Sequence, residues 1–185
     1  MGRFRLQTLV LRAGYFALLP LFGIAGAQTP AKAPPPREAI LTAAQKLMTA
    51  YPYCALASLD SAGRPSIRTM SPFPPEADMT VWFATNDQSR KYLELMKDPR
   101  VTVYYSNHQR AEGYVALQGK ATLVSDMAEI KKRKRAYWDQ AFPGLKHLVL
   151  IKVVPDRLEI VSYKDRLDNS GKDTWEAPSV DFPAK

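Results

Sequence analysis

Turn-forming residues interrupt this chain at short intervals, and the segments between them have the length and composition of β-strands. Seven segments are predicted as strands: 53–59, 64–71, 80–85, 100–107, 112–124, 147–154 and 157–163. Few of the remaining segments have the apolar spacing of a helix. Many short strands with few helices predict a mainly β (α+β) fold, a small antiparallel β-barrel with peripheral helices.

Two of the predicted turns make strand pairing antiparallel. Asp60-Ser-Ala-Gly63 separates the first two strands and ends on a glycine, as hairpin turns often do. Pro155-Asp156 separates the last two, which predicts a closing hairpin. Gly119 lies inside the longest strand and predicts a bend or bulge of a tightly curved wall.

Three helices are expected around the strands. An apolar stripe at helical spacing begins after Arg37 and stops at Pro52. A short helix is predicted over 89–97, where Pro99 follows, and Asp126 is expected to cap a basic helix that continues to about Gln140. The first stripe consists of Ile40, Ala44, Leu47, Met48 and Tyr51.

The N-terminus has the layout of a secretory signal. Arg3, Arg5 and Arg12 precede the apolar run 13–27, which ends in Ala-Gly-Ala. That run is shorter than the roughly 20 residues a spanning helix needs. We therefore expect a signal peptide over 1–27, a periplasmic or secreted mature protein, and no stable membrane insertion after cleavage.

The rest of the chain divides into a linker, one domain and a tail. Residues 28–36 are rich in proline and predict an extended linker, 37–164 predict the folded domain, and 165–185 are expected to pack on the domain or on a dimer partner. In that tail, Trp175 is expected at a dimer contact rather than over a ligand. Cys54 is the only cysteine, and with no histidine near it in the sequence, burial is favoured over a nucleophilic role.

One strand-to-helix junction has the composition of an anion site. Ser89, Arg90 and Lys91 fall in the first turn of the predicted helix, where free backbone N–H groups and the helix dipole favour a phosphate. The net charge of +8 also favours anionic ligands. A capped surface helix with solvated basic residues explains the same pattern equally well.

Arg68 is a second unusual residue, because it lies inside a strand that otherwise fits a barrel wall. Charged side chains are seldom buried without a partner. An outward-facing arginine explains the alternation of this strand equally well. The residue gains interest only if its strand lies beside the anion site.

Other polar clusters favour ordinary roles. The basic run Lys131–Arg135 could bind nucleic acid, but a solvated helix face is preferred in an exported chain, so no nucleic-acid partner is expected. His108 and His147 are far apart and lack further ligands at metal spacing, so no metal site is predicted. No glycine-rich dinucleotide loop or nucleophile elbow is present.

The order of several motifs resembles the FMN-binding split-barrel superfamily related to pyridoxamine 5'-phosphate oxidase, and most closely its general-stress-protein branch. These motifs are Gly63-Arg-Pro, Arg68-Thr-Met, Val81-Trp-Phe-Ala-Thr-Asn, Ser89-Arg-Lys, Asp98-Pro-Arg-Val, Tyr114-Val-Ala-Leu-Gln-Gly and Phe142-Pro-Gly. The resemblance covers about residues 53–163.

The resemblance implies a six-stranded split barrel that forms a homodimer, with FMN across the subunit interface. It also implies a role for each of eight residues. Along the flavin ring and ribityl chain lie Arg68, Thr69 and Met70; the next strand contributes Thr85 and Asn86; the phosphate is held by Ser89, Arg90 and Lys91.

Two departures argue against vitamin B6 oxidation. Phe73 stands where the oxidase has a basic residue, and the oxidase's C-terminal basic motif has no counterpart. We therefore expect an FMN-binding flavoprotein, an oxidoreductase using the flavin for electron or hydride transfer, with a stress-related role. The alternative is a non-enzymatic exported binding module for FMN, haem or another ligand. No catalytic acid or base is assigned.

Overall fold

A computed structural model of the 185-residue chain describes residues 34–168 and 176–183. The predicted signal peptide, most of the linker and Trp175 lie outside the described residues, so the expectations for them remain predictions. The helices are α1 (Arg37–Ala50), α2 (Arg90–Lys97), α3 (Met127–Lys132) and α4 (Trp138–Ala141), with a 3-10 turn at Pro143–Leu145. The strands are β1 (Cys54–Leu59), β2 (Pro65–Met70), β3 (Val81–Asn86), β4 (Arg100–Ser106), β5 (Gly113–Val124), β6 (Leu148–Ser162) and β7 (Ser179–Asp181).

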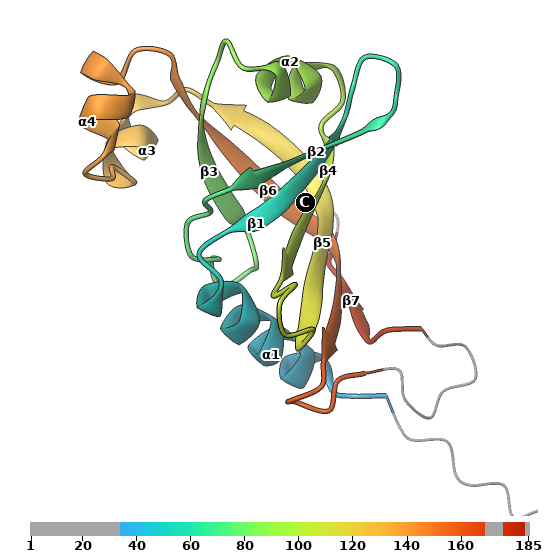
Figure 1. Cartoon of the computed structure of the whole chain (residues 1–185). Coiled ribbons are helices and arrows are strands. Elements are labelled where there is room, and N and C mark those ends of the chain that lie inside the picture. Colours follow the sequence, from blue (N-terminus) through green and yellow to red (C-terminus); the bar gives the residue numbers. More distant parts are fainter. Residues whose placement is uncertain (1–33, 169–175, 184–185) are drawn as a thin grey trace, which may run out of the picture. The chain divides into compact units, whose positions relative to one another are not determined.

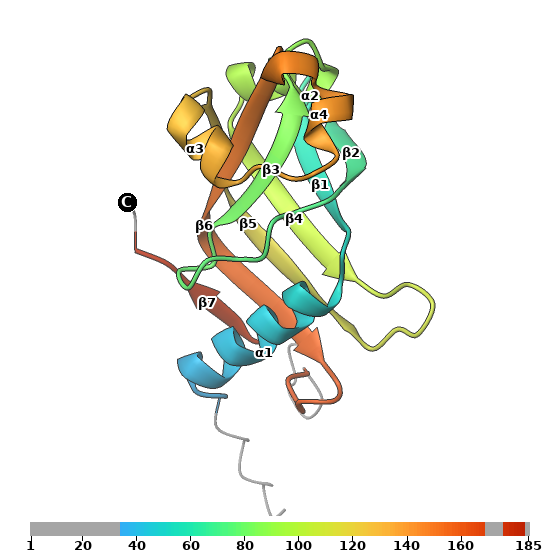
Figure 2. The ribbon, with the colours of Figure 1, turned by 90° about the vertical axis from the view of Figure 1, so that its left-hand side faces the viewer.

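The strands form one antiparallel sheet in the order β2-β1-β4-β5-β6-β3, and β7 pairs with β6. The sheet curls around a core, with α2 near one end and α1 across the other (Figures 1 and 2). Its two edges, β2 and β3, do not pair with each other. The loop after β2 reaches β3 instead, where Phe73 N–H donates to the Trp82 carbonyl at 2.8 Å. The result is the predicted split barrel, an open rather than a closed sheet.

The expected hairpin around Pro155-Asp156 was wrong, because β6 runs unbroken through both residues. Pro155 pairs with Gly119, at the place where the register of β5 against β6 shifts. A bulge tolerates the missing proline N–H, so no turn is needed. The predicted irregularity at Gly119 is thereby confirmed, and the seventh strand is β7, from the C-terminal tail.

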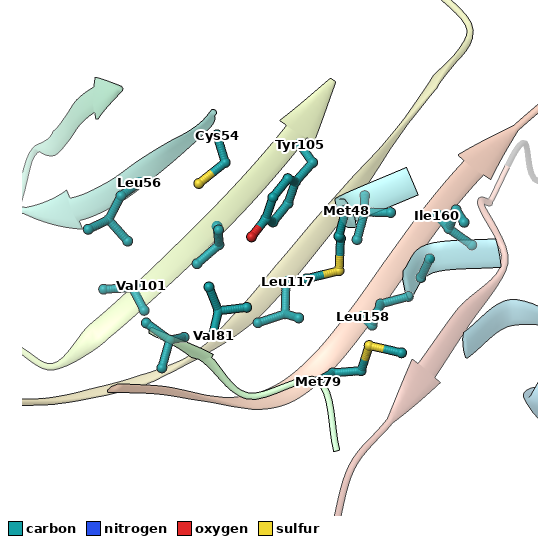
Figure 3. Packing of buried hydrophobic residues seen from close by; sticks show 14 of the residues in the cluster. Met48, Cys54, Leu56, Met79, Val81, Val101, Tyr105, Leu117, Leu158 and Ile160 are labelled. Atoms are coloured by element: carbon teal, nitrogen blue, oxygen red, sulfur yellow. The ribbon is translucent and has the colours of Figure 1, made fainter. Parts of the chain in front are cut away.

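The core inside the barrel is apolar and is closed by α1. Ile40, Ala44 and Met48 are buried as predicted, while Leu47 and Tyr51 are partly buried against the same cluster. Figure 3 shows Met48 among buried side chains of the sheet, with Leu117 of β5 and Leu158 of β6 beside it. Cys54 belongs to this core and is 5% exposed, which confirms its predicted burial.

A second, smaller core lies on the other face of β3 and β6. Trp82, Ile130, Trp138, Leu148 and Leu150 are buried there, contributed by α3, α4 and the two strands. In the described part of the chain, no helix has the length and apolar character that a membrane crossing requires.

The predicted basic helix breaks after Lys132, and the solvated-face interpretation of its basic run was wrong for two residues. Arg133 stacks on Trp82, 3.7 Å from the ring centroid, and Arg135 stacks on Phe73 at 4.0 Å. In a helix, two residues that are two positions apart, such as Arg133 and Arg135, point to different faces. The helix ends before them, and both side chains can therefore contact the barrel. Arg135 also donates to the Pro72 carbonyl at 2.6 Å.

Candidate cofactor-phosphate site

The barrel interior becomes polar at the end beneath α2. Along β2, Ser66, Arg68 and Met70 are shielded while Ile67 and Thr69 are exposed, so the strand alternates inward and outward. On β1, Ser58 pairs with Ser66 and is 2% exposed. The outward-facing alternative for Arg68 was therefore wrong, since its side chain is only 15% exposed.

The partner of Arg68 is Glu94, a buried carboxylate on α2. Arg68 Nη2 forms an ion pair and a hydrogen bond with Glu94 Oε2. The same oxygen accepts from Ser58 Oγ at 2.6 Å. Burial acts to raise the pKa of Glu94, but hydrogen bonds from Ser58 and Arg68 outweigh it and lower that pKa below the ordinary value. Glu94 is therefore an anion at neutral pH.

The N-terminus of α2 gathers two hydroxyls and an ammonium group. Ser89 caps the helix, with Oγ 3.4 Å from Tyr92 N, and lies 3.2 Å from Thr85 Oγ1. Lys91 Nζ donates to Thr85 Oγ1 at 3.1 Å. Burial is the main cause that lowers the pKa of Lys91, followed by the positive charge of Arg68. The charges of Lys91 and Arg68 therefore repel each other within this site.

Arg90 connects the two groups of residues. Its Nη2 donates to Ser66 Oγ at 3.1 Å, and its Nε lies 3.1 Å from Glu94 Oε1. That second contact is an ion pair without hydrogen-bond geometry, because Oε1 has no hydrogen-bond partner among the described residues. Three cations thus surround one carboxylate, which leaves a surplus of positive charge at the helix N-terminus.

Five of the eight predicted site residues meet in this cluster: Arg68, Thr85, Ser89, Arg90 and Lys91. The other three are placed differently. Thr69 lies on the outer face of the sheet, Met70 is buried in the core, and the Asn86 side chain accepts from Gln88 N at 2.7 Å.

The sequence analysis missed Ser58, Ser66 and Glu94. Ser58 and Ser66 gave a weak signal, because they flank the predicted hairpin turn, and they pair across a loop that is one residue longer than predicted. Glu94 gave no comparable signal. Its position one turn after Arg90 looks like an exposed helical ion pair until the fold places it against β1 and β2.

The other polar residues singled out do not join this cluster. His147 Nδ1 lies 2.9 Å from Asp87 Oδ1, at the loop before α2, and His108 stacks on Tyr104. No group of three or more histidine, cysteine, aspartate or glutamate residues at metal-binding range occurs within 34–168 and 176–183.

An open antiparallel barrel whose polar end carries a surplus of positive charge at a helix N-terminus defines a split-barrel protein with a cationic end. The chain belongs to the pyridoxamine 5'-phosphate oxidase family, whose sequence pattern matches residues 40–162. Among curated proteins, none matches the sequence.

Solved structures share this fold at low sequence identity. A Clostridium acetobutylicum protein related to general stress protein 26 of Bacillus subtilis is 16% identical, with a TM-score of 0.60 over 68% of this chain and 90% of its own. A pyridoxamine 5'-phosphate oxidase-related, FMN-binding protein from Nostoc punctiforme is 16% identical, with a TM-score of 0.55 over 83% and 100%. A haem-binding protein from Mycobacterium smegmatis is 15% identical, with a TM-score of 0.55 over 71% and 57%.

Proposed function

We propose that this protein binds FMN, with the cofactor phosphate at the N-terminus of α2. The observation that carries the proposal is the meeting of Thr85, Ser89 and Lys91, with Arg90 beside them. Hydroxyl, ammonium and guanidinium groups are the donors that a phosphate requires, and the helix dipole adds to them. The donor set therefore fits a phosphate monoester.

In this proposal, the ring lies along β2. Within the described residues, β1 is the only strand paired with β2, so one edge of β2 can present backbone N–H and C=O groups to a ligand. Arg68 points inward and Thr69 outward. A ring at this edge would contact the backbone of both residues and the side chain of Thr69.

The activity proposed is that of an oxidoreductase. Bound FMN would supply the electron or hydride transfer, as flavins do. The chain's own residues would fix the phosphate and place positive charge near it. A stress-related role is part of the proposal, suggested by the similarity to a relative of general stress protein 26.

We also propose a homodimer that uses the outer face of the sheet. One row of paired residues on that face runs from Thr69 through Ala55, Tyr104 and Ala116 to Glu159. The alanines of this row, Ala55 and Ala116, allow close approach of another sheet. Ile67, which is 66% exposed, adds apolar surface on the same face.

A non-enzymatic binding module is the second candidate. It draws support from the similarity to a haem-binding protein, and from the predicted export signal. A visible spectrum of the protein purified from the exported fraction separates the two candidates by the bound chromophore. N-terminal sequencing of the same sample tests the proposed start at Gln28.

The FMN proposal is tested by changing Arg90 to Ala and titrating both FMN and riboflavin. A charge-assisted contact contributes roughly 1.5–3 kcal/mol. At 1.4 kcal/mol per factor of ten, FMN affinity should fall about tenfold to hundredfold, while riboflavin, which lacks the phosphate, should hardly change. Arg110→Ala is the matched control, because both arginine side chains are 74% exposed and Arg110 is distant in the chain.

Fluorescence quenching measures the four affinities, and thermal melts verify that each variant is folded. Equal weakening for both flavins would mean that Arg90 supports the fold and does not hold the phosphate. No binding of either flavin by the wild-type protein would reject FMN, and haem would then be tested.

A further inference from the structure

Arg68 differs from the other two cations of the site because protein acceptors take up the hydrogen bonds of both its terminal nitrogens. Its Nη1 donates to the Leu56 carbonyl at 3.3 Å and to Ser58 Oγ at 2.6 Å. Its Nη2 donates to Ser66 Oγ at 2.9 Å and to Glu94. Both terminal nitrogens are therefore engaged with protein acceptors.

Arg90 and Lys91 remain available to a ligand. The Arg90 side chain is 74% exposed, and one of the two acceptors near it is the Ser66 hydroxyl. Lys91 donates one hydrogen bond to Thr85, and an ammonium group has two further N–H donors. An incoming anion therefore meets these two cations first.

Glu94 competes with any such anion. Its Oε1 is buried without a hydrogen bond among the described residues, and its nearest charged partner is Arg90 Nε at 3.1 Å. When Arg90 turns to a phosphate, Glu94 loses that attraction. A carboxylate near the bound dianion also repels it directly, and a partly buried site screens this repulsion weakly.

We propose that Glu94 is an internal counter-anion that occupies Arg68 and competes for Arg90, so that it limits the affinity of this site for phosphate groups. The inference rests on the proposed phosphate site. Three cations (Arg68, Arg90 and Lys91) and the charged Glu94 together carry a net charge of about +2. This matches the charge of a phosphate monoester, about −2 near neutral pH. Because Glu94 lowers the affinity for phosphate, it would make phosphate binding readily reversible.

The test is inorganic phosphate binding to the wild-type protein and to Glu94→Gln, measured by calorimetry and by the rise in melting temperature with phosphate concentration. The amide keeps the size of the side chain and an acceptor for Arg68, but removes the charge. We expect phosphate affinity to increase about tenfold, the size of a charge effect of roughly 1.4 kcal/mol. Glu38→Gln on the exposed face of α1 changes the net charge equally and should leave phosphate affinity unchanged.

A double variant, Arg68→Met with Glu94→Met, covers the case in which the single variant does not fold. Replacing both members of a buried ion pair by apolar residues is often tolerated. If Arg68 is fully occupied by Glu94, phosphate affinity should not fall by more than about threefold, because the net charge is unchanged and Arg90 is released from Glu94. A tenfold or greater loss would mean that Arg68 itself holds the anion, and would overturn the proposal.

The flavin titrations keep this inference apart from the FMN proposal. Tighter phosphate binding by Glu94→Gln without flavin binding supports the counter-anion and rejects FMN. Flavin binding with phosphate affinity equal or weaker in Glu94→Gln rejects the counter-anion and retains FMN. Absence of phosphate binding in both proteins also overturns the inference.

Discussion

Cys54 and Tyr105 place two polar groups in an otherwise apolar core. Both side chains lie among the strands of the barrel (Figure 3). Burial raises the pKa of the Cys54 thiol to about 12, and the smaller opposing influence of Tyr105 does not offset it. The Tyr105 hydroxyl makes no hydrogen bond of good geometry in the described structure. The thiol is therefore protonated and shielded at neutral pH.

We predict that Cys54 in the native protein is unreactive toward a thiol reagent at pH 8. A free thiol has a pKa near 8.5, so a shift to about 12 lowers the thiolate fraction on the order of a thousandfold. Because the pKa is raised in the folded protein, the contribution of this thiol to the free energy of unfolding is fully present below about pH 8.5. That contribution is lost as the pH rises toward 12. The chain has one cysteine, so absorbance of the released reagent reports on Cys54 alone. A native rate close to the rate in denaturant would contradict the prediction.

At the scale of elements, the pair β5 and β6 is the longest part of the sheet, and its shape depends on Gly119. A Cβ at this position would lie 2.1 Å from the Val154 carbonyl oxygen and 2.9 Å from its carbon. Both are backbone atoms of the facing strand, so neither can move away as a flexible side chain can. The bulge therefore requires glycine, because the facing backbone leaves no room for a Cβ atom.

We predict that Gly119→Ala lowers the free energy of unfolding by about 3 kcal/mol or more, the upper end of overpacking costs. Denaturant unfolding measures it. Gly63→Ala is the control, since its Cβ would meet nothing within 4 Å and only the positive φ of 76° is unfavourable. That loss should be about 1 kcal/mol. Equal losses would show that the bulge can widen.

The segment containing α3 and α4 is held to the barrel by arginines. Arg133 stacks on Trp82 and pairs with Glu76 at 2.9 Å, with only 11% of its side chain exposed. Stacked and partly buried cations of this kind contribute more than exposed ones. The neighbouring Lys131 and Lys132 are exposed.

We predict that Arg133→Ala destabilises the protein by about 2 kcal/mol, whereas Lys132→Ala stays within about 0.5 kcal/mol of the wild type. Thermal and denaturant unfolding of the two variants make the comparison. Near-UV circular dichroism should also change for Arg133→Ala alone, because Trp82 loses its cover. Similar behaviour of the two variants would restore the solvated-face interpretation of this run.

The first five strands could be predicted from sequence because turn formers bracket each of them. β6 could not, since Pro155-Asp156 has the composition of a turn and only its pairing with Gly119 makes it part of a strand. The helix N-terminus at Ser89 was predictable from local spacing. The partner of Arg68 was not, because Glu94 approaches it only after α2 packs on the barrel.

At the scale of the whole molecule, the outer face of the sheet is the surface proposed for a second copy. Ala116 lies within this row, between Tyr104 on β4 and Glu159 on β6. Tyr104 and Tyr114 stack beside it, with ring centroids 5.5 Å apart. A long charged side chain in this row would keep another sheet at a distance.

We predict that the wild-type protein is a dimer at micromolar concentration and that Ala116→Arg is a folded monomer. Light scattering gives the two masses. Ala62→Arg introduces the same side chain in the exposed turn between β1 and β2 and should remain dimeric. A wild-type monomer, or a dimer unaffected by Ala116→Arg, would remove this face from the proposal.

The long strand β6 also determines when the sheet can be completed during synthesis. β3 ends at Asn86, and among the described strands it pairs only with β6, which begins at Leu148. At about 5–20 residues per second, the ribosome needs roughly 3–12 s to make the intervening chain. Throughout that interval the apolar β3 has no strand to pair with. In a chain built in this order, the β3 edge of the sheet can be completed only after β6 has been made.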